Sequence, residues 1–112
     1  MKSAHRLALL LVTTPDLDTA RRLATGLVEA RLAACVNLVP GLESHYRWQG
    51  KVESAAEVLL VIKTAARLVP RLERWVLQEH PYDTPEILLL PLAAGTARYL
   101  AWLGQSVGTE PT

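Results

Sequence analysis

The chain has 112 residues, of which 50% are hydrophobic and 5% aromatic, so it is long enough for one domain with a core of aliphatic side chains. Its 12 Lys and Arg residues nearly balance 11 Asp and Glu residues, which argues against a nucleic-acid-binding surface or a polybasic membrane anchor. A single Cys cannot form an internal disulfide, and no apolar run approaches the roughly 20 residues of a membrane span. We expect a soluble cytoplasmic protein with one domain over residues 1–112, of which 108–112 form a disordered tail.

The first elements predicted are a strand and a helix. Residues 6–14 are apolar at both parities, which is typical of a strand buried on two faces, and the run is too short for a secretory signal. Pro15 ends this strand. Asp16 is a suitable N-cap for the helix that follows, in which apolar residues recur at helical spacing as far as Val28.

A long hairpin comes next. Residues 33–39 predict a strand that closes at Pro40, after which residues 42–48 continue extended. Gln49-Gly50 predicts a tight turn, because Gly readily adopts the positive φ that such turns need. Residues 52–64 are then the return strand.

The second half of the chain repeats a helix and a strand. A helix is expected over 67–79, because Pro81 forces His80 out of the helical region. A strand follows at 86–90, and Gly95-Thr96 opens a short last helix. The order β-α-β-β-α-β with an extra C-terminal helix predicts a ferredoxin-like α+β fold.

The strand pattern also predicts an assembly of several chains. Right-handed crossovers would place both internal helices on one face of the sheet, which leaves the other face without cover from its own chain. The strands at 7–12, 58–62 and 87–90 are apolar at both parities, so that second face is hydrophobic as well. We therefore expect a homotrimer in which neighbouring subunits cover this face.

Five collinear motifs in this framework resemble those of the CutA divalent-cation tolerance proteins, and the resemblance covers residues 6–107. The motifs are Arg31–Asn37 (RLAACVN), Tyr46–Lys51 (YRWQGK), Lys63-Thr64, His80–Glu86 (HPYDTPE) and Tyr99–Trp102 (YLAW). The resemblance implies a small cytoplasmic trimer, akin to the nitrogen-regulatory PII proteins, that acts in tolerance of divalent metal ions. It implies binding of copper or a similar divalent cation, and no enzymatic reaction.

The candidate metal ligands are His80, Cys35 and Glu79. Thiolate and imidazole suit copper, and the carboxylate suits a harder cation. None of the three stands at a chelating spacing, so a site would have to be assembled by the fold or between subunits. Where some relatives carry a Cys and a His-His pair, this chain has Val12 and Glu79-His80. At Cys35 we favour a small buried hydrophobe over a ligand, and for His80 helix capping and a role in a site both stay open.

A ligand cleft is the second candidate site, because polar-tipped aromatic and charged residues concentrate in the motifs. Tyr46 belongs to the same motifs. The residues predicted to line the cleft are Trp48, Lys63, Tyr82, Glu86, Tyr99 and Trp102. We expect these side chains to converge on one concavity that holds a small anion or zwitterion, with Lys63 as its charge partner. Packing at subunit interfaces is the alternative role for the aromatic residues.

Two other functions stay open beside metal tolerance through direct binding. One is a PII-like small-molecule sensor whose link to metals is indirect, and the other is a trimeric scaffold that presents its surface to another protein. Catalysis is disfavoured. Cys35, His80 and Glu86 could imitate a Cys-His-acid arrangement, but the sequence has no nucleophile elbow, oxyanion loop or phosphate-binding Gly-rich loop.

Overall fold

The expected alternation of strands and helices is present in the computed structural model, which describes residues 1–108. Residues 109–112, most of the predicted disordered tail, lie outside the described residues. Gly108, the first residue of that predicted tail, is hydrogen-bonded to the main body. Its N–H donates to the carbonyl of Arg31 at 2.9 Å, and its own carbonyl accepts from Arg67, because the chain returns to the main body after the last helix.

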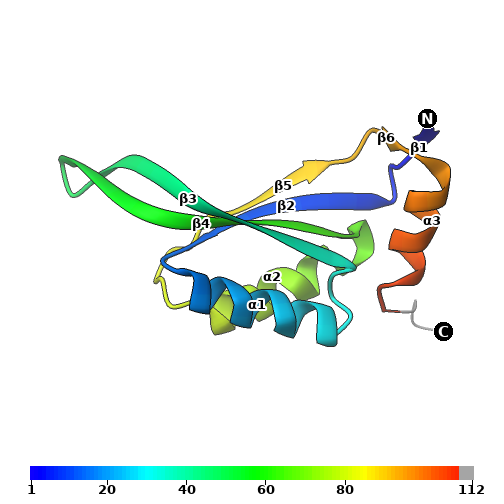
Figure 1. Cartoon of the computed structure of the whole chain (residues 1–112), viewed down its shortest axis with the longest axis horizontal. Helices are drawn as coiled ribbons and strands as arrows, with labels where there is room; N and C mark the ends of the chain where they lie inside the picture. Colours follow the sequence, from blue (N-terminus) through cyan, green and yellow to red (C-terminus); the bar gives the residue numbers. More distant parts are fainter. Residues whose placement is uncertain (109–112) are drawn as a thin grey trace.

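The main sheet has the ferredoxin-like strand order β3-β4-β2-β5, and each neighbouring pair is antiparallel. Strand β2 lies in the middle of the sheet (Figure 1). Its neighbours are β4, which follows the hairpin turn, and β5, which follows the second helix. The four strands are β2 (Leu7–Thr14), β3 (Cys35–Trp48), β4 (Lys51–Ala65) and β5 (Ile87–Pro91).

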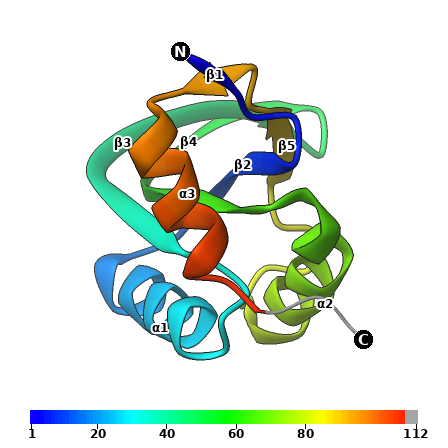
Figure 2. The same cartoon turned by 90° about the vertical axis from the view of Figure 1, so that its right-hand side faces the viewer.

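Two helices cover one face of this sheet, as the crossover rule predicts (Figures 1 and 2). Helix α1 (Leu17–Glu29) begins where the Asp16 carboxylate accepts the backbone N–H of Thr19 at 2.8 Å. A short 3₁₀ turn, η1 (Ala66–Leu68), leads into α2 (Val69–Glu79), whose Pro70 lies in the first turn. None of the helices among the described residues is long and apolar enough to cross a bilayer.

The core lies between the sheet and these two helices. Alternate residues of the central strands point towards the helices and are at most 1% exposed. They pack against Leu23 and Leu27 of α1 and against Leu72 and Val76 of α2. The strand residues concerned are Leu10, Val12, Leu60 and Ile62.

The opposite face of the sheet, which we call the open face, has no helix of its own chain over its middle (Figure 1). Its apolar side chains are cross-strand neighbours in the register, and the two on β5 are 53% and 41% exposed. They are Leu9, Leu11, Leu59, Val61, Leu88 and Leu90.

The β3–β4 hairpin extends well beyond the helices and gives the molecule its long axis of 46 Å (Figure 1). Its turn is the predicted Gln49-Gly50, where φ is +50° and +77° as in a type I′ hairpin turn. The predicted closure of the strand at Pro40 is wrong. Strand β3 runs through this point, because a bulge at Pro40-Gly41, with φ of +80° at Gly41, absorbs the register shift.

The far end of the sheet is occupied by elements close to the two chain ends. A two-stranded sheet joins β1 (Lys2–Ser3) to β6 (Ala94–Gly95), and α3 (Ala97–Gln105) packs beside it (Figures 1 and 2). This small sheet is not among the elements predicted from the sequence, since strands of two residues carry no periodic signal.

Candidate functional site

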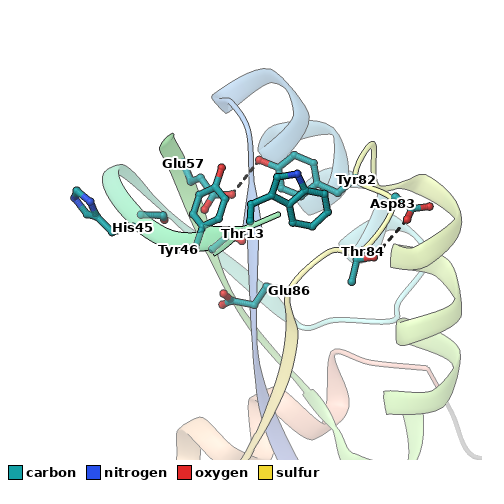
Figure 3. A pocket seen from close by; sticks show the side chains of 10 residues that line it. Thr13, His45, Tyr46, Glu57, Tyr82, Asp83, Thr84 and Glu86 are labelled. Carbon is teal, nitrogen blue, oxygen red and sulfur yellow. Dashed lines mark hydrogen bonds between the residues drawn. The ribbon is translucent and has the colours of Figure 1, made fainter. Parts of the chain in front are cut away.

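A cavity of about 700 Å³ opens between the β3–β4 hairpin and the loop that precedes β5 (Figure 3). It lies where the hairpin leaves the helices, on the same side of β4 as the open face. Its lining is aromatic, hydroxylic and acidic. The lining residues are Thr13, Ser44, His45, Tyr46, Trp48, Glu57, Tyr82, Asp83, Thr84 and Glu86.

The hairpin contributes to the cavity through strand alternation. Ser44, Tyr46 and Trp48 are spaced by two along β3, so they share one face. The register pairs Leu42 with Glu57, which places the Glu57 carboxylate on that same face of β4. Glu57 is not among the site residues predicted from the sequence. The available signal was a carboxylate standing directly before the apolar run of residues 58–62.

Tyr82 closes the cavity from the side of the loop. Its hydroxyl donates to Glu57 Oε2 at 3.0 Å, and Figure 3 shows this bond reaching across from the loop to β4. Burial, followed by the hydrogen bond to Glu57 and the charge of Glu57, raises the pKa of Tyr82 to about 12. The phenol is therefore neutral at physiological pH and acts as a hydrogen-bond donor.

His80 is buried and contacts Tyr82 through its imidazole ring. Its Nε2 lies 2.7 Å from the carbonyl oxygen of Thr13, and its Nδ1 accepts the backbone N–H of Tyr82 at 3.1 Å. Because a carbonyl only accepts and an amide N–H only donates, Nε2 carries the proton and the ring is neutral. Both ring nitrogens are occupied, so His80 has no free lone pair for a metal ion. Its ring also contacts Tyr82, with the ring centroids 4.8 Å apart.

The three candidate metal ligands are not brought together within one chain. Cys35 lies on β3, half-buried, with its Sγ 3.8 Å from Asn37 Oδ1 and 3.9 Å from Lys63 Nζ. Glu79 ends α2, where its backbone carbonyl accepts from Arg22. Across residues 1–108, no three His, Cys, Asp or Glu side chains gather closely enough to hold a metal ion.

The cleft predicted from the motifs is only half present in a single chain. Trp48, Tyr82 and Glu86 line the cavity as expected. Lys63 lies further along β4, where its ammonium group donates to Asn37. Tyr99 and Trp102 are on α3 with their ring centroids 5.5 Å apart, and α3 packs at the other end of the sheet (Figure 1). The reason is topological, because β4 and α3 carry these three residues away from the hairpin.

Comparison with known proteins identifies the family. The family model described as CutA1 divalent ion tolerance protein matches residues 8–106. The chain belongs to this family. It is 51% identical over 98 residues to the divalent-cation tolerance protein CutA of Thermus thermophilus, an alignment that covers 88% of this chain and 95% of that protein.

Solved structures of CutA proteins share the fold. The crystal structure of CutA1 from Oryza sativa has a TM-score of 0.91 and 43% identity, over 93% of this chain and 95% of that one. A CutA structure from Archaeoglobus fulgidus, described as a periplasmic divalent cation tolerance protein, has a TM-score of 0.88 and 34% identity, over 91% of this chain and 99% of that one. The chain spans about half the length of the curated plant CutA proteins that it matches. The family predicted from the five motifs and the predicted fold class are both confirmed.

Proposed function

We propose that this CutA-family chain acts in divalent-cation tolerance as a cytoplasmic homotrimer that binds ligands and catalyses no reaction. The open face carries this proposal. Leu88 and Leu90 are 53% and 41% exposed there, beside Leu9 and Leu11 of the neighbouring strand. Soluble monomers rarely expose a contiguous apolar patch larger than a few hundred Å², so a partner surface is expected over these residues.

The two edges of the sheet support a ring of subunits. Strand β3 is one edge and β5 is the other, and β3 is much longer than β5. Two different surfaces that pair head-to-tail can close a set of subunits into a ring. A two-fold dimer instead needs one surface that pairs with itself. The projecting end of the hairpin supplies an edge that a neighbour can cover. The resemblance to the CutA family is the reason for proposing three subunits in this ring.

For the metal, the separation of the candidate ligands favours a site that more than one protomer builds. Cys35 pairs in register with Lys63, which in turn pairs with Leu9, so Cys35 lies on the open face and would reach a neighbour there. Copper or a similar divalent cation would then be bound by Cys35 with carboxylates of the adjoining subunit. His80 would have to give up one of two hydrogen bonds to take part.

Sedimentation followed by calorimetric titration tests both parts of the proposal. The expected species has three times the 12.3 kDa mass of one chain, and it binds Cu²⁺ or Zn²⁺ at a fixed ratio to the trimer. In Cys35→Ser, loss of copper binding with an unchanged Tm would support Cys35 as a ligand. An unchanged isotherm with a lower Tm would assign it to packing and move the site elsewhere. A folded 12.3 kDa monomer that binds no divalent ion would contradict the proposal.

The cytoplasmic location rests on cysteine usage. A single Cys offers no internal disulfide, so nothing in the chain calls for an oxidising compartment. Cell fractionation of the native organism, with cytoplasmic and periplasmic marker proteins as controls, checks this part of the proposal. Recovery with the periplasmic marker would contradict it.

The cavity supports a second candidate function, that of a small-molecule sensor. Its volume of about 700 Å³ falls within the range of roughly 300–1,000 Å³ that small-molecule sites occupy. Calorimetry with a panel of metabolites, with and without a divalent ion, separates the two functions. Metabolite binding that needs no metal ion favours the sensor.

A further inference from the structure

We propose that the cavity between the hairpin and the loop before β5 binds a small organic cation, a group with an alkylammonium or quaternary ammonium centre. This inference deepens the ligand-binding part of the proposed function and rests on it. It replaces the small anion or zwitterion that the sequence analysis expected, since Lys63 lies outside the cavity.

The charge of the cavity favours a cation. Glu57, Asp83 and Glu86 line it, and its described lining includes no Lys or Arg side chain. Lys51 pairs in register with Trp48 at the end of the hairpin but does not line the cavity. Among residues 1–108, no ion pair reaches any of the three carboxylates. His45 also lines the cavity, and its Nε2 lies 3.5 Å from the carboxylate of Glu43, which is outside the cavity. A pocket lined by three carboxylates without a Lys or Arg side chain attracts positive ligands and repels anions.

The aromatic residues favour an organic cation over a metal ion. Tyr46, Trp48 and Tyr82 contribute their rings to the same cavity, and an ammonium group within about 6 Å of such a ring is attracted by its π face. Figure 3 shows Tyr46 and Tyr82 on the side of the cavity where Tyr82 is bonded to Glu57, and Glu86 lower in the view. A metal site built by protein ligands usually has three or more of them converging, and among residues 1–108 no three His, Cys, Asp or Glu side chains gather closely enough to form one.

The cavity wall is held in place before any ligand arrives. The hydroxyl of Tyr82 is fixed by Glu57, and its backbone N–H is fixed by His80, which is itself bonded to Thr13 of β2. The loop is thus tied to two strands of the sheet. A wall fixed in this way lowers the ordering cost of binding, as expected for a pre-formed ligand site.

Calorimetric titration with choline chloride tests the proposal, with 3,3-dimethylbutan-1-ol as a neutral probe of the same shape. We expect choline to bind, the neutral probe to bind at least about fivefold more weakly, and acetate not to bind. Glu86→Gln and Trp48→Leu should each weaken choline binding by about fivefold or more, because one removes a charge and the other a ring. Glu73→Gln, an exposed residue of α2 outside the cavity, is the matched control and should leave binding unchanged.

Three outcomes would overturn the inference. They are equal affinity for choline and its neutral analogue, no binding of choline, and binding of a divalent metal that Glu86→Gln abolishes. Sedimentation and Cu²⁺ titration of the same samples keep the proposed function separate. A trimer that binds a divalent ion but not choline contradicts the organic-cation site alone, whereas a monomer that binds neither contradicts both.

Discussion

The two faces of the sheet are built from nearly the same residue types and have opposite environments. On β2 and β4, Leu10 and Leu60 face the helices and are at most 1% exposed, while Leu11 and Leu59 face the other way and are only partly covered. On β5, Leu88 faces the same way as Leu11 and is 53% exposed. The apolar character of a residue therefore does not show whether a helix of its own chain or a partner covers it. The helices of the chain cover one face, and the other is left for a partner.

The largest predicted difference in the free energy of unfolding is between truncating a core side chain and truncating a surface side chain. Leu60→Ala leaves a cavity under α1 and α2, so we expect it to lower the free energy of unfolding by about 3–5 kcal/mol. Leu77→Ala, on the outer side of α2 and 51% exposed, should change it by less than about 0.5 kcal/mol. Urea denaturation followed by circular dichroism measures both. Equal losses would mean that the covered face is not the main core.

The second prediction concerns the open face and uses a matched pair. Leu88 and Leu77 are 53% and 51% exposed in one chain, but only Leu88 lies on the open face. Leu88→Asp should therefore shift the sedimenting species from three times 12.3 kDa towards one chain, because a charge would be buried in the interface. Leu77→Asp should leave the mass unchanged. If both variants sediment with the mass of the wild-type species, the open face is not an interface between subunits.

A third prediction concerns how closely the covering helices pack. A Cβ atom at Gly26 of α1 would lie 2.5 Å from the Trp75 ring of α2, whereas one at Gly104 of α3 would meet nothing within 4 Å. Gly26→Ala should lower the free energy of unfolding by about 1–3 kcal/mol through overpacking. Gly104→Ala should raise it by about 0.5–1 kcal/mol through the helix propensity of Ala. Thermal unfolding monitored by calorimetry checks the two signs.

The smallest effect on stability is expected at Asp16, the residue that caps the start of α1. The backbone N–H of Thr19 holds the pKa of Asp16 below its ordinary value. A lowered folded pKa adds stability above the unfolded pKa of about 4, and this stability is lost as the pH falls through the folded pKa. Asp16→Asn keeps a capping oxygen without the titration. The wild type should therefore lose stability relative to Asp16→Asn between about pH 4 and pH 2, and parallel denaturation curves across that range would refute this assignment.

Much of the fold followed from local signals. Asp16 caps α1, Pro81 ends α2 by holding His80 in an extended conformation, and Gln49-Gly50 forms the hairpin turn, all as predicted. These signals act within four residues of chain, so sequence alone carries them. The order of strands and helices along the chain also predicted the ferredoxin-like fold. The bulge at Pro40-Gly41 was misread as a strand end, because the same residues end strands and bend them.

The candidate site was decided by contacts between distant parts of the chain. The bond from Tyr82 to Glu57 spans 25 residues and that from His80 to Thr13 spans 67, and neither leaves a periodic signal in the sequence. The motifs named Trp48, Tyr82 and Glu86, which line the cavity, but they could not show that both nitrogens of His80 are occupied. Composition and periodicity determine which residues prefer burial and which elements form, because those preferences are local. Only the tertiary structure decides which polar groups meet, since hydrogen bonding and charge depend on a few ångströms between residues far apart in sequence.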